Sequence, residues 1–97
     1  MNPQTQSRVF VCSLAVTRGG ASVLNTTGSR PYPMDNDLVQ QYDISSPRLG
    51  FTVYIASGQD VRVGDVIAMT GAVTKTVRVV GLGAWVDPIE LHTEQVV

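Results

Sequence analysis

Apolar and polar residues alternate along most of this chain with a period of two. Gly, Pro, Asn and Asp interrupt the alternation at short intervals, a pattern typical of short β-strands joined by turns. No stretch of ten or more residues places apolar positions at the i, i+3, i+4 spacing of a helix. The sequence therefore predicts an all-β domain of five to seven short strands, forming a small barrel of SH3-like or compact Greek-key type.

The apolar positions of the alternating segments predict the core of this barrel. Its predicted members are Val53, Ile55, Val66, Val77, Val79 and Leu91. The first segment, residues 8–16, is apolar on both faces, which is typical of a strand that is covered on both sides. We expect the second cover to be another subunit or another part of a closed barrel.

Residues 25–47 are the least regular part of the chain and are rich in Pro, Ser, Asn and Asp. A connection of this length is unusual inside a compact domain and is commonly functional. We expect one domain, residues 1–97, with residues 25–47 as a long inserted loop that projects and takes part in assembly. Aromatic and Met side chains are favoured at interfaces. The predicted subunit-interface residues are Tyr32, Met34, Leu38, Tyr42, Arg48 and Phe10.

The amino-acid composition of the chain limits the classes of function that it can have. The chain has 97 residues, of which 15% are charged, against about 25% in an average soluble domain. Such low charge fits a surface covered by partners, and equally a surface wetted by Ser, Thr, Asn and Gln. A net charge of −1 implies no general attraction to nucleic acid or to an anionic membrane. We expect neither a secretory signal nor a membrane span.

The chemistry-bearing residues are too few for a metal site or a catalytic centre. Cys12 is the only cysteine and His92 the only histidine, so an intrachain disulfide is excluded and a metal site lacks its three or four convergent ligands. We expect Cys12 to behave as a small hydrophobe and His92 to lie on the outward face of the last strand. The sequence predicts no metal, no cofactor and no enzymatic activity.

Three further motifs are weak. Asp35-Asn36-Asp37 resembles the opening of a calcium loop but lacks the later Gly and Glu, so a polar turn or a helix N-cap is the better interpretation. Gly81-Leu82-Gly83 lacks the third Gly and the helix of a dinucleotide fingerprint. Trp85 is expected to fill the barrel rather than to stack on a base.

The second half of the chain resembles a known family in the order and spacing of its motifs. Residues 59–67, Gln-Asp-Val-Arg-Val-Gly-Asp-Val-Ile, are followed by the strand at 76–81, by Ala84-Trp85, and by the strand at 89–94; Ser46-Pro47-Arg48-Leu49 precede them. This arrangement resembles the head-to-tail connector proteins of tailed phages, of the head-closure or stopper kind. The resemblance covers about residues 43–97.

The resemblance implies a structural role in the virion. Copies would form a homo-oligomeric ring, a hexamer or a dodecamer, in the neck between capsid and tail. The ring would bind portal or adaptor proteins on one side and tail or terminator proteins on the other. DNA would pass through the lumen without sequence-specific binding, no membrane would be involved, and assembly would occur in the bacterial host cytoplasm.

A second class of function is a small β-barrel binding module for nucleic acid or a peptide. Basic residues interleaved with exposed aromatics on one sheet would favour it, and Tyr54 and Trp85 are the candidate aromatics. Arg48, Arg62 and Arg78 are either solvated or are available to carboxylates across an interface. An enzyme is the third class, and the chain offers no convergent nucleophile, base and oxyanion donors for it.

Overall fold

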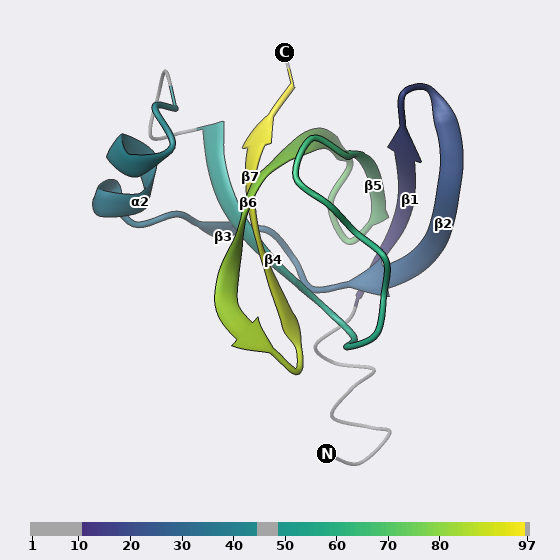
Figure 1. Ribbon diagram of the computed structural model, residues 1–97. Helices are drawn as coiled ribbons and strands as arrows, with labels where there is room; N and C mark the ends of the chain where they lie inside the picture. Colours follow the sequence, from purple (N-terminus) through teal and green to yellow (C-terminus); the bar gives the residue numbers. More distant parts are fainter. Residues whose placement is uncertain (1–10, 45–48, 97) are drawn as a thin grey trace.

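A computed structural model describes residues 11–44 and 49–96, apart from the side chains of residues 84–86 (Figure 1). Among these residues one short helix accompanies the strands, α2 (Asn36–Gln41). The strands are β1 (Cys12–Arg18), β2 (Ala21–Gly28), β3 (Tyr32–Pro33), β4 (Gly50–Ile55), β5 (Val66–Gly71), β6 (Lys75–Val86) and β7 (Ile89–Gln95).

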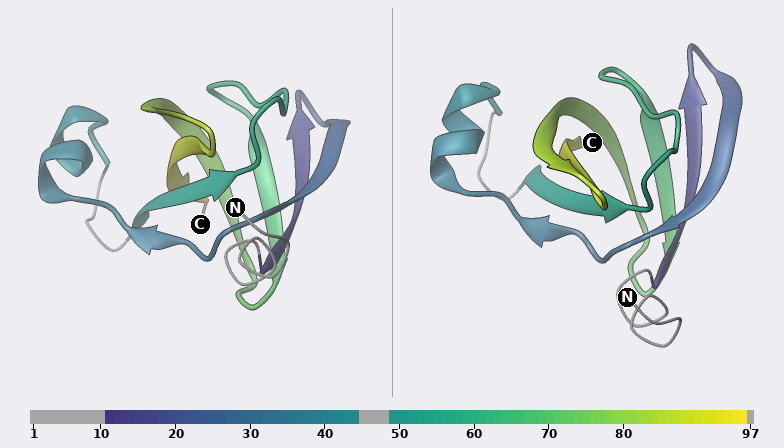
Figure 2. Two further views of the ribbon diagram at one scale, coloured as in Figure 1. Left: turned by 90° about the horizontal axis from the view of Figure 1, so that it is seen from below. Right: turned by 60° about the horizontal axis from the view of Figure 1, so that its bottom comes forward.

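The seven strands form one antiparallel sheet in the order β2-β1-β5-β6-β7-β4-β3. An additional pairing of β2 with β4, Gly28↔Ile55, brings the two ends of this sheet together. The sheet therefore curls into a near-barrel ring, as the two turned views show (Figure 2). This confirms the predicted small all-β barrel of five to seven strands.

Gly28 and Ser29 form the corner at which the chain leaves β1 and joins β4. A Cβ on Gly28 would lie 2.6 Å from Cδ1 of Leu14 and 3.2 Å from the carbonyl oxygen of Tyr54, so only glycine fits without displacement. At Ser29 the backbone N–H donates to the carbonyl of Tyr54 over 2.8 Å, and the hydroxyl accepts from the N–H of Tyr54 over 2.9 Å. One continuous segment thus pairs first with β1 and then with β4, which closes the ring.

The main core fills this ring. Five of the six residues predicted for it are buried, and Val66 is half-buried. The prediction for Val66 was wrong by one position, because β5 pairs with β1 in the register Val16↔Ile67, which turns Ile67 inward. The buried members are Cys12, Leu14, Val16, Val53, Ile55, Val61, Ile67, Met69, Val77, Val79 and Leu91.

A second, smaller core lies between α2 and the outside of the sheet. Its buried members are Met34, Val39 and Ile44, and Val80 of β6 packs against them. Residues 25–44 therefore differ from the irregular loop expected there, since they contain the end of β2, then β3 and α2. Asp35 is the N-cap residue of α2, without a side-chain capping bond, so this Asp-Asn-Asp run begins a helix.

Strand β1 is covered on only one side. Cys12, Leu14 and Val16 are buried, whereas Ser13 and Ala15 are exposed. Cover of the second face by another part of the barrel is not found, because no other element of the described chain packs on the outer side of β1. Cover by another subunit stays a prediction. Residues 8–10 of that predicted strand lie outside the described residues.

Candidate interaction surface

The predicted interface residues lie in different environments. Tyr32 is 49% exposed. Met34 is buried in the second core, and Leu38 and Tyr42 are half-buried against it. Phe10 and Arg48 lie outside the described residues. Tyr32 is therefore the one exposed residue among the predicted interface residues that the structure describes.

The backbone on both sides of Tyr32 holds it in place. Tyr32 pairs with Thr52 and Pro33 with Phe51, and the N–H of Met34 donates to the carbonyl of Gly50 over 3.1 Å. The ring of Tyr32 packs edge-on against Tyr54 with 6.0 Å between centroids. Proline on either side of Tyr32 fixes φ and removes a backbone donor, so this sheet edge is protected from pairing with another strand.

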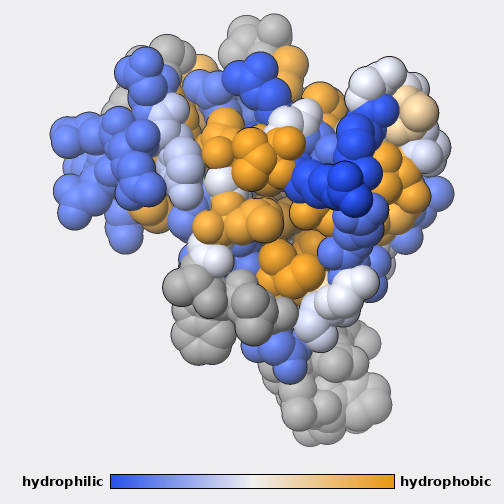
Figure 3. Space-filling model, in the orientation of Figure 1, coloured by the Kyte–Doolittle hydropathy of each residue, from blue (hydrophilic) through white to orange (hydrophobic). Residues whose placement is uncertain are grey.

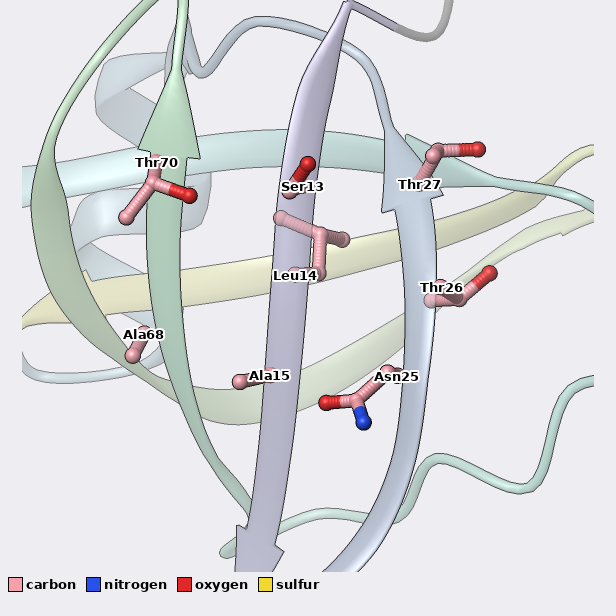
Figure 4. Close-up of a pocket in the computed structure, with 8 residues that line it drawn as sticks. All are labelled: Ser13, Leu14, Ala15, Asn25, Thr26, Thr27, Ala68 and Thr70. Carbon is pink, nitrogen blue, oxygen red and sulfur yellow. The ribbon is translucent and has the colours of Figure 1, made fainter.

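A shallow hollow lies on the outer face of β2, β1 and β5, with a volume of about 410 Å³ (Figure 4). The strand register arranges its exposed side chains in two rows across the three strands. The rows are Thr70–Ser13–Thr27 and Ala68–Ala15–Asn25. None of the lining residues is charged. The hollow exists because these side chains are short.

The free edge of β2 continues this face. Strand β2 pairs with β4 only at Gly28↔Ile55, so within residues 11–44 and 49–96 its segment before Gly28 has a strand partner on the β1 side alone. That segment, Ala-Ser-Val-Leu-Asn-Thr-Thr, contains neither charge nor proline. Natural proteins usually protect an open edge with charged residues, proline or a β-bulge. Here the one interruption of the β1–β2 register is an irregularity near Val16.

Apolar side chains also reach the surface on the face that Figure 1 presents. Hydrophobic residues gather in the middle of that face, between α2 and the β1–β2 hairpin (Figure 3). The large apolar residues with the highest exposure in the described chain are Tyr32, Val63, Leu82 and Val96. A single exposed apolar residue needs no explanation, but several on a chain of low charge favour contact with a partner.

A chain of four polar side chains crosses β4 and β7 beneath the second core. The hydroxyl of Tyr42 lies 2.8 Å from Nδ1 of His92, and Nε2 of His92 lies 3.2 Å from a carboxylate oxygen of Glu90. The hydroxyl of Tyr54 donates to the other oxygen of Glu90 over 3.2 Å. Burial, together with this hydrogen bond, raises the pKa of Tyr54.

His92 lies on the outward face of β7, as predicted, but it is buried there. Its strand position does point away from the main core, but Tyr42 covers it, and only 5% of the residue is exposed. Gly81 leaves the space for this contact, since a Cβ there would lie 2.3 Å from the hydroxyl oxygen of Tyr42. The chain of hydrogen bonds therefore fastens α2 to the sheet, and all of its polar atoms that are buried are satisfied.

A second polar cluster fastens the loop before β5 to the end of β1. Asp65 is 1% exposed, and the guanidinium of Arg18 donates a hydrogen bond to each of its carboxylate oxygens, over 2.8 and 3.0 Å. The backbone N–H of Arg62 donates to the same carboxylate over 2.8 Å. The hydrogen bonds from Arg18 hold the pKa of Asp65 below its ordinary value, against the opposing effect of burial.

This cluster predicts a loss of stability in acid. Because the folded state keeps Asp65 ionised more strongly than the unfolded chain does, the stabilisation is complete above the unfolded pKa of about 3.9 and is lost as pH falls through the lower folded pKa. Asp65→Asn should lower the free energy of unfolding at pH 7 by about 2–3 kcal/mol, less than the roughly 3–5 kcal/mol of a fully buried pair, since Arg18 is partly exposed. Urea unfolding at pH 7 and pH 3 checks this: the variant should lose less stability between the two than the parent. An equal loss in both would contradict it.

Among residues 11–44 and 49–96, no three His, Cys, Asp or Glu side chains come close enough to hold a metal ion. Cys12 is buried in the main core, and the side chain of Trp85 lies outside the described part of the chain. The helix within the described residues is too short and too polar to cross a membrane.

No protein-family model, curated protein or solved structure matches this chain.

The sequence marks Tyr32 as a candidate interface residue, and it does not mark the hollow or the open β2 edge. In the sequence, small or short polar residues occupy alternate positions in three segments, residues 13–15, 25–27 and 68–70. This pattern could have indicated the hollow. What was missing was the register, which places these three short patterns side by side. The open edge could not be found either, because it depends on where β2 parts from β4.

Proposed function

We propose that this chain is a structural subunit of a protein assembly, rather than an enzyme, and that the assembly is a ring at the head-to-tail junction of a tailed phage. The observation that carries the first part is the bare outer face of β2, β1 and β5. On that face a small domain leaves a broad area free of charge and free of long side chains. A lack of charged residues is a property of the buried centre of protein interfaces.

The residues of this face make docking of a partner energetically favourable. Ser, Thr and Ala lose little rotamer freedom when a partner covers them, and no charge has to be removed from water. The β2 edge beside the face leaves one strand edge open, whereas prolines protect the edge at β3. An edge left open next to a bare face favours association at this side of the molecule.

The specific place in a phage rests on the sequence resemblance of residues 43–97. It implies a hexameric or dodecameric ring between portal or adaptor proteins and the tail or its terminator protein. The near-barrel fold is compatible with this role. A net charge of −1 also suits a lumen through which DNA passes without being held.

The alternative binding module for nucleic acid has less support. The hollow carries no Lys or Arg, and the hydroxyl of Tyr54, one of the two candidate stacking aromatics, is bonded to Glu90. Arg78 is paired with Glu94 over 3.2 Å and Arg62 with Asp60 over 3.2 Å. Nucleic-acid surfaces need free cations together with free aromatic faces.

A stop codon early in the gene for this chain tests the proposal in infected cells. We expect DNA-filled heads and complete tails that stay separate under the electron microscope, and joined particles when the chain is supplied from a plasmid. Growth in a host that suppresses the stop codon is the control. Normal yields of joined, infectious particles without the chain would contradict the proposal.

A further inference from the structure

We propose that Tyr32 of one copy seats in the hollow on β2, β1 and β5 of the next copy, so that copies associate head to tail. This inference rests on the proposed function in one respect, which is that the chain works as an assembly of identical copies. It adds the contact itself: the aromatic side chain that is offered, and the surface that receives it.

Tyr32 is built to project. Its backbone is fixed by pairing with Thr52 and by the prolines on either side, and its ring leans on Tyr54. Even so, 49% of the residue is exposed. An aromatic side chain with few rotors, held on a rigid backbone, loses little entropy on binding, which is why tyrosine is common among the residues that dominate interfaces.

The hollow has the size and chemistry to receive a tyrosine. At about 410 Å³ it is open and larger than the roughly 150 Å³ cavity that holds a benzene ring in another protein. Ala15 and Ala68 offer the ring a smooth apolar floor, while Ser13, Thr27 and Thr70 place hydroxyl groups along one side (Figure 4). The tyrosine hydroxyl would find its hydrogen-bond partner among these groups.

The two surfaces lie in different parts of the molecule. Tyr32 lies on β3, near the middle of Figure 1 and below α2, whereas β1, β2 and β5 form the opposite side; both views of Figure 2 keep them apart. A chain that carries a projecting group on one side and its receptor on another associates heterologously, and such contacts close into a ring when the rotation between copies allows it. A ring of identical subunits needs this kind of interface.

Other occupants fit the hollow less well. An acidic or basic segment would bring a charge to a lining that offers no opposite charge. Val63, Leu82 and Val96 are also exposed, but they lack a hydroxyl to meet the four hydroxyl groups of the hollow. Two copies meeting hollow to hollow would bury polar side chains against each other and leave Tyr32 in water.

Two variants that disable opposite sides of the contact test the proposal. Tyr32→Ala removes the projecting ring, and Ala15→Arg fills the hollow with a long charged side chain. We expect each to weaken self-association, measured by analytical ultracentrifugation at high protein concentration, by about 30-fold or more, the scale of an interface hot spot. Leu82→Ala, at a residue of equal exposure outside the hollow, is the matched control and should change little.

Mixing the two variants separates this contact from any other mode of association. The Ala15→Arg chain still offers Tyr32, and the Tyr32→Ala chain still offers an intact hollow, so the mixture should form pairs that do not grow further. Pairing in each variant alone, or no pairing in the mixture, would overturn the proposal. Circular dichroism of each variant verifies that it is folded.

Cysteine cross-linking in a Cys12→Ser background gives an independent result. A chain with both Arg30→Cys, at an exposed residue two positions before Tyr32, and Ala68→Cys keeps the tyrosine ring and should cross-link into a ladder of many copies under mild oxidation. A mixture of the two single variants should stop at dimers, and Leu82→Cys with Ala68→Cys should give no ladder. If rings join heads to tails in cells but these cross-links fail, the proposed function stands and this contact is wrong. If the ladder forms but heads and tails join without the chain, the contact stands and the phage role is wrong.

Discussion

Replacing Leu91 with alanine should lower the free energy of unfolding by about 2–5 kcal/mol, the range for large-to-small changes in a close-packed core. Leu91 is fully buried in the main core, on β7 opposite Val53 of β4 and Leu82 of β6. Alanine there would leave a cavity next to the line along which β4, β6 and β7 meet. Because a domain of this size is stabilised by only about 5–15 kcal/mol, such a loss should move the midpoint of urea unfolding far toward zero.

Leu82→Ala is the matched control for this prediction. The variant removes the same atoms from the cross-strand partner of Leu91, but the side chain of Leu82 is largely at the surface, since this residue is 49% exposed. Surface substitutions of this kind usually change stability by no more than about 0.5 kcal/mol. Urea unfolding of both variants, followed by circular dichroism, measures the difference. Equal losses in the two variants would show that the main core is not where this account places it.

Replacing Tyr42 with alanine should release α2 from the sheet. Tyr42 packs against the second core, and its hydroxyl meets Nδ1 of His92. The expected cost is about 2–4 kcal/mol, below the roughly 3–5 kcal/mol for a fully buried aromatic residue, because Tyr42 is half-buried. Hydrogen exchange should show faster exchange in Asn36–Gln41, while the strands of the main core keep their protection.

Tyr42→Phe divides this effect into its two parts. The phenyl ring keeps the packing but leaves Nδ1 of the buried His92 without the partner seen here, which should cost about 1–3 kcal/mol. If Tyr42→Phe matches Tyr42→Ala, the hydrogen bond alone holds the helix. If neither variant changes exchange in α2, the polar chain from Tyr42 to Tyr54 does not fasten this segment.

The sequence was sufficient to predict the class of fold and most of the main core, because alternation with a period of two is a direct consequence of strand geometry. It failed where tertiary contacts decide the outcome. Val66 and Ile67 are both apolar, and only the pairing with β1 determines which one points inward. His92 occupies an outward position, and only the packing of Tyr42 buries it.

The candidate site was less predictable than the fold. Tyr32 stood out as an aromatic residue between prolines, but Met34, from the same segment, is buried in the chain's own second core. Local pattern could not separate the two, because a large apolar side chain before a helix can either pack in the chain's own core or face a partner. The hollow depends on three strands that are adjacent in space and distant in sequence, so no single motif marks it.

The most direct test of the central claim is the mass of the chain in solution with its proposed partner. Light scattering should be recorded for the chain alone, for the portal protein of the same phage alone, and for their mixture. We expect a stable complex in which the added mass corresponds to six or twelve copies of the chain per portal ring, the numbers that the family resemblance implies. A mixture whose components keep their separate masses, or a complex holding one or two copies, would contradict it.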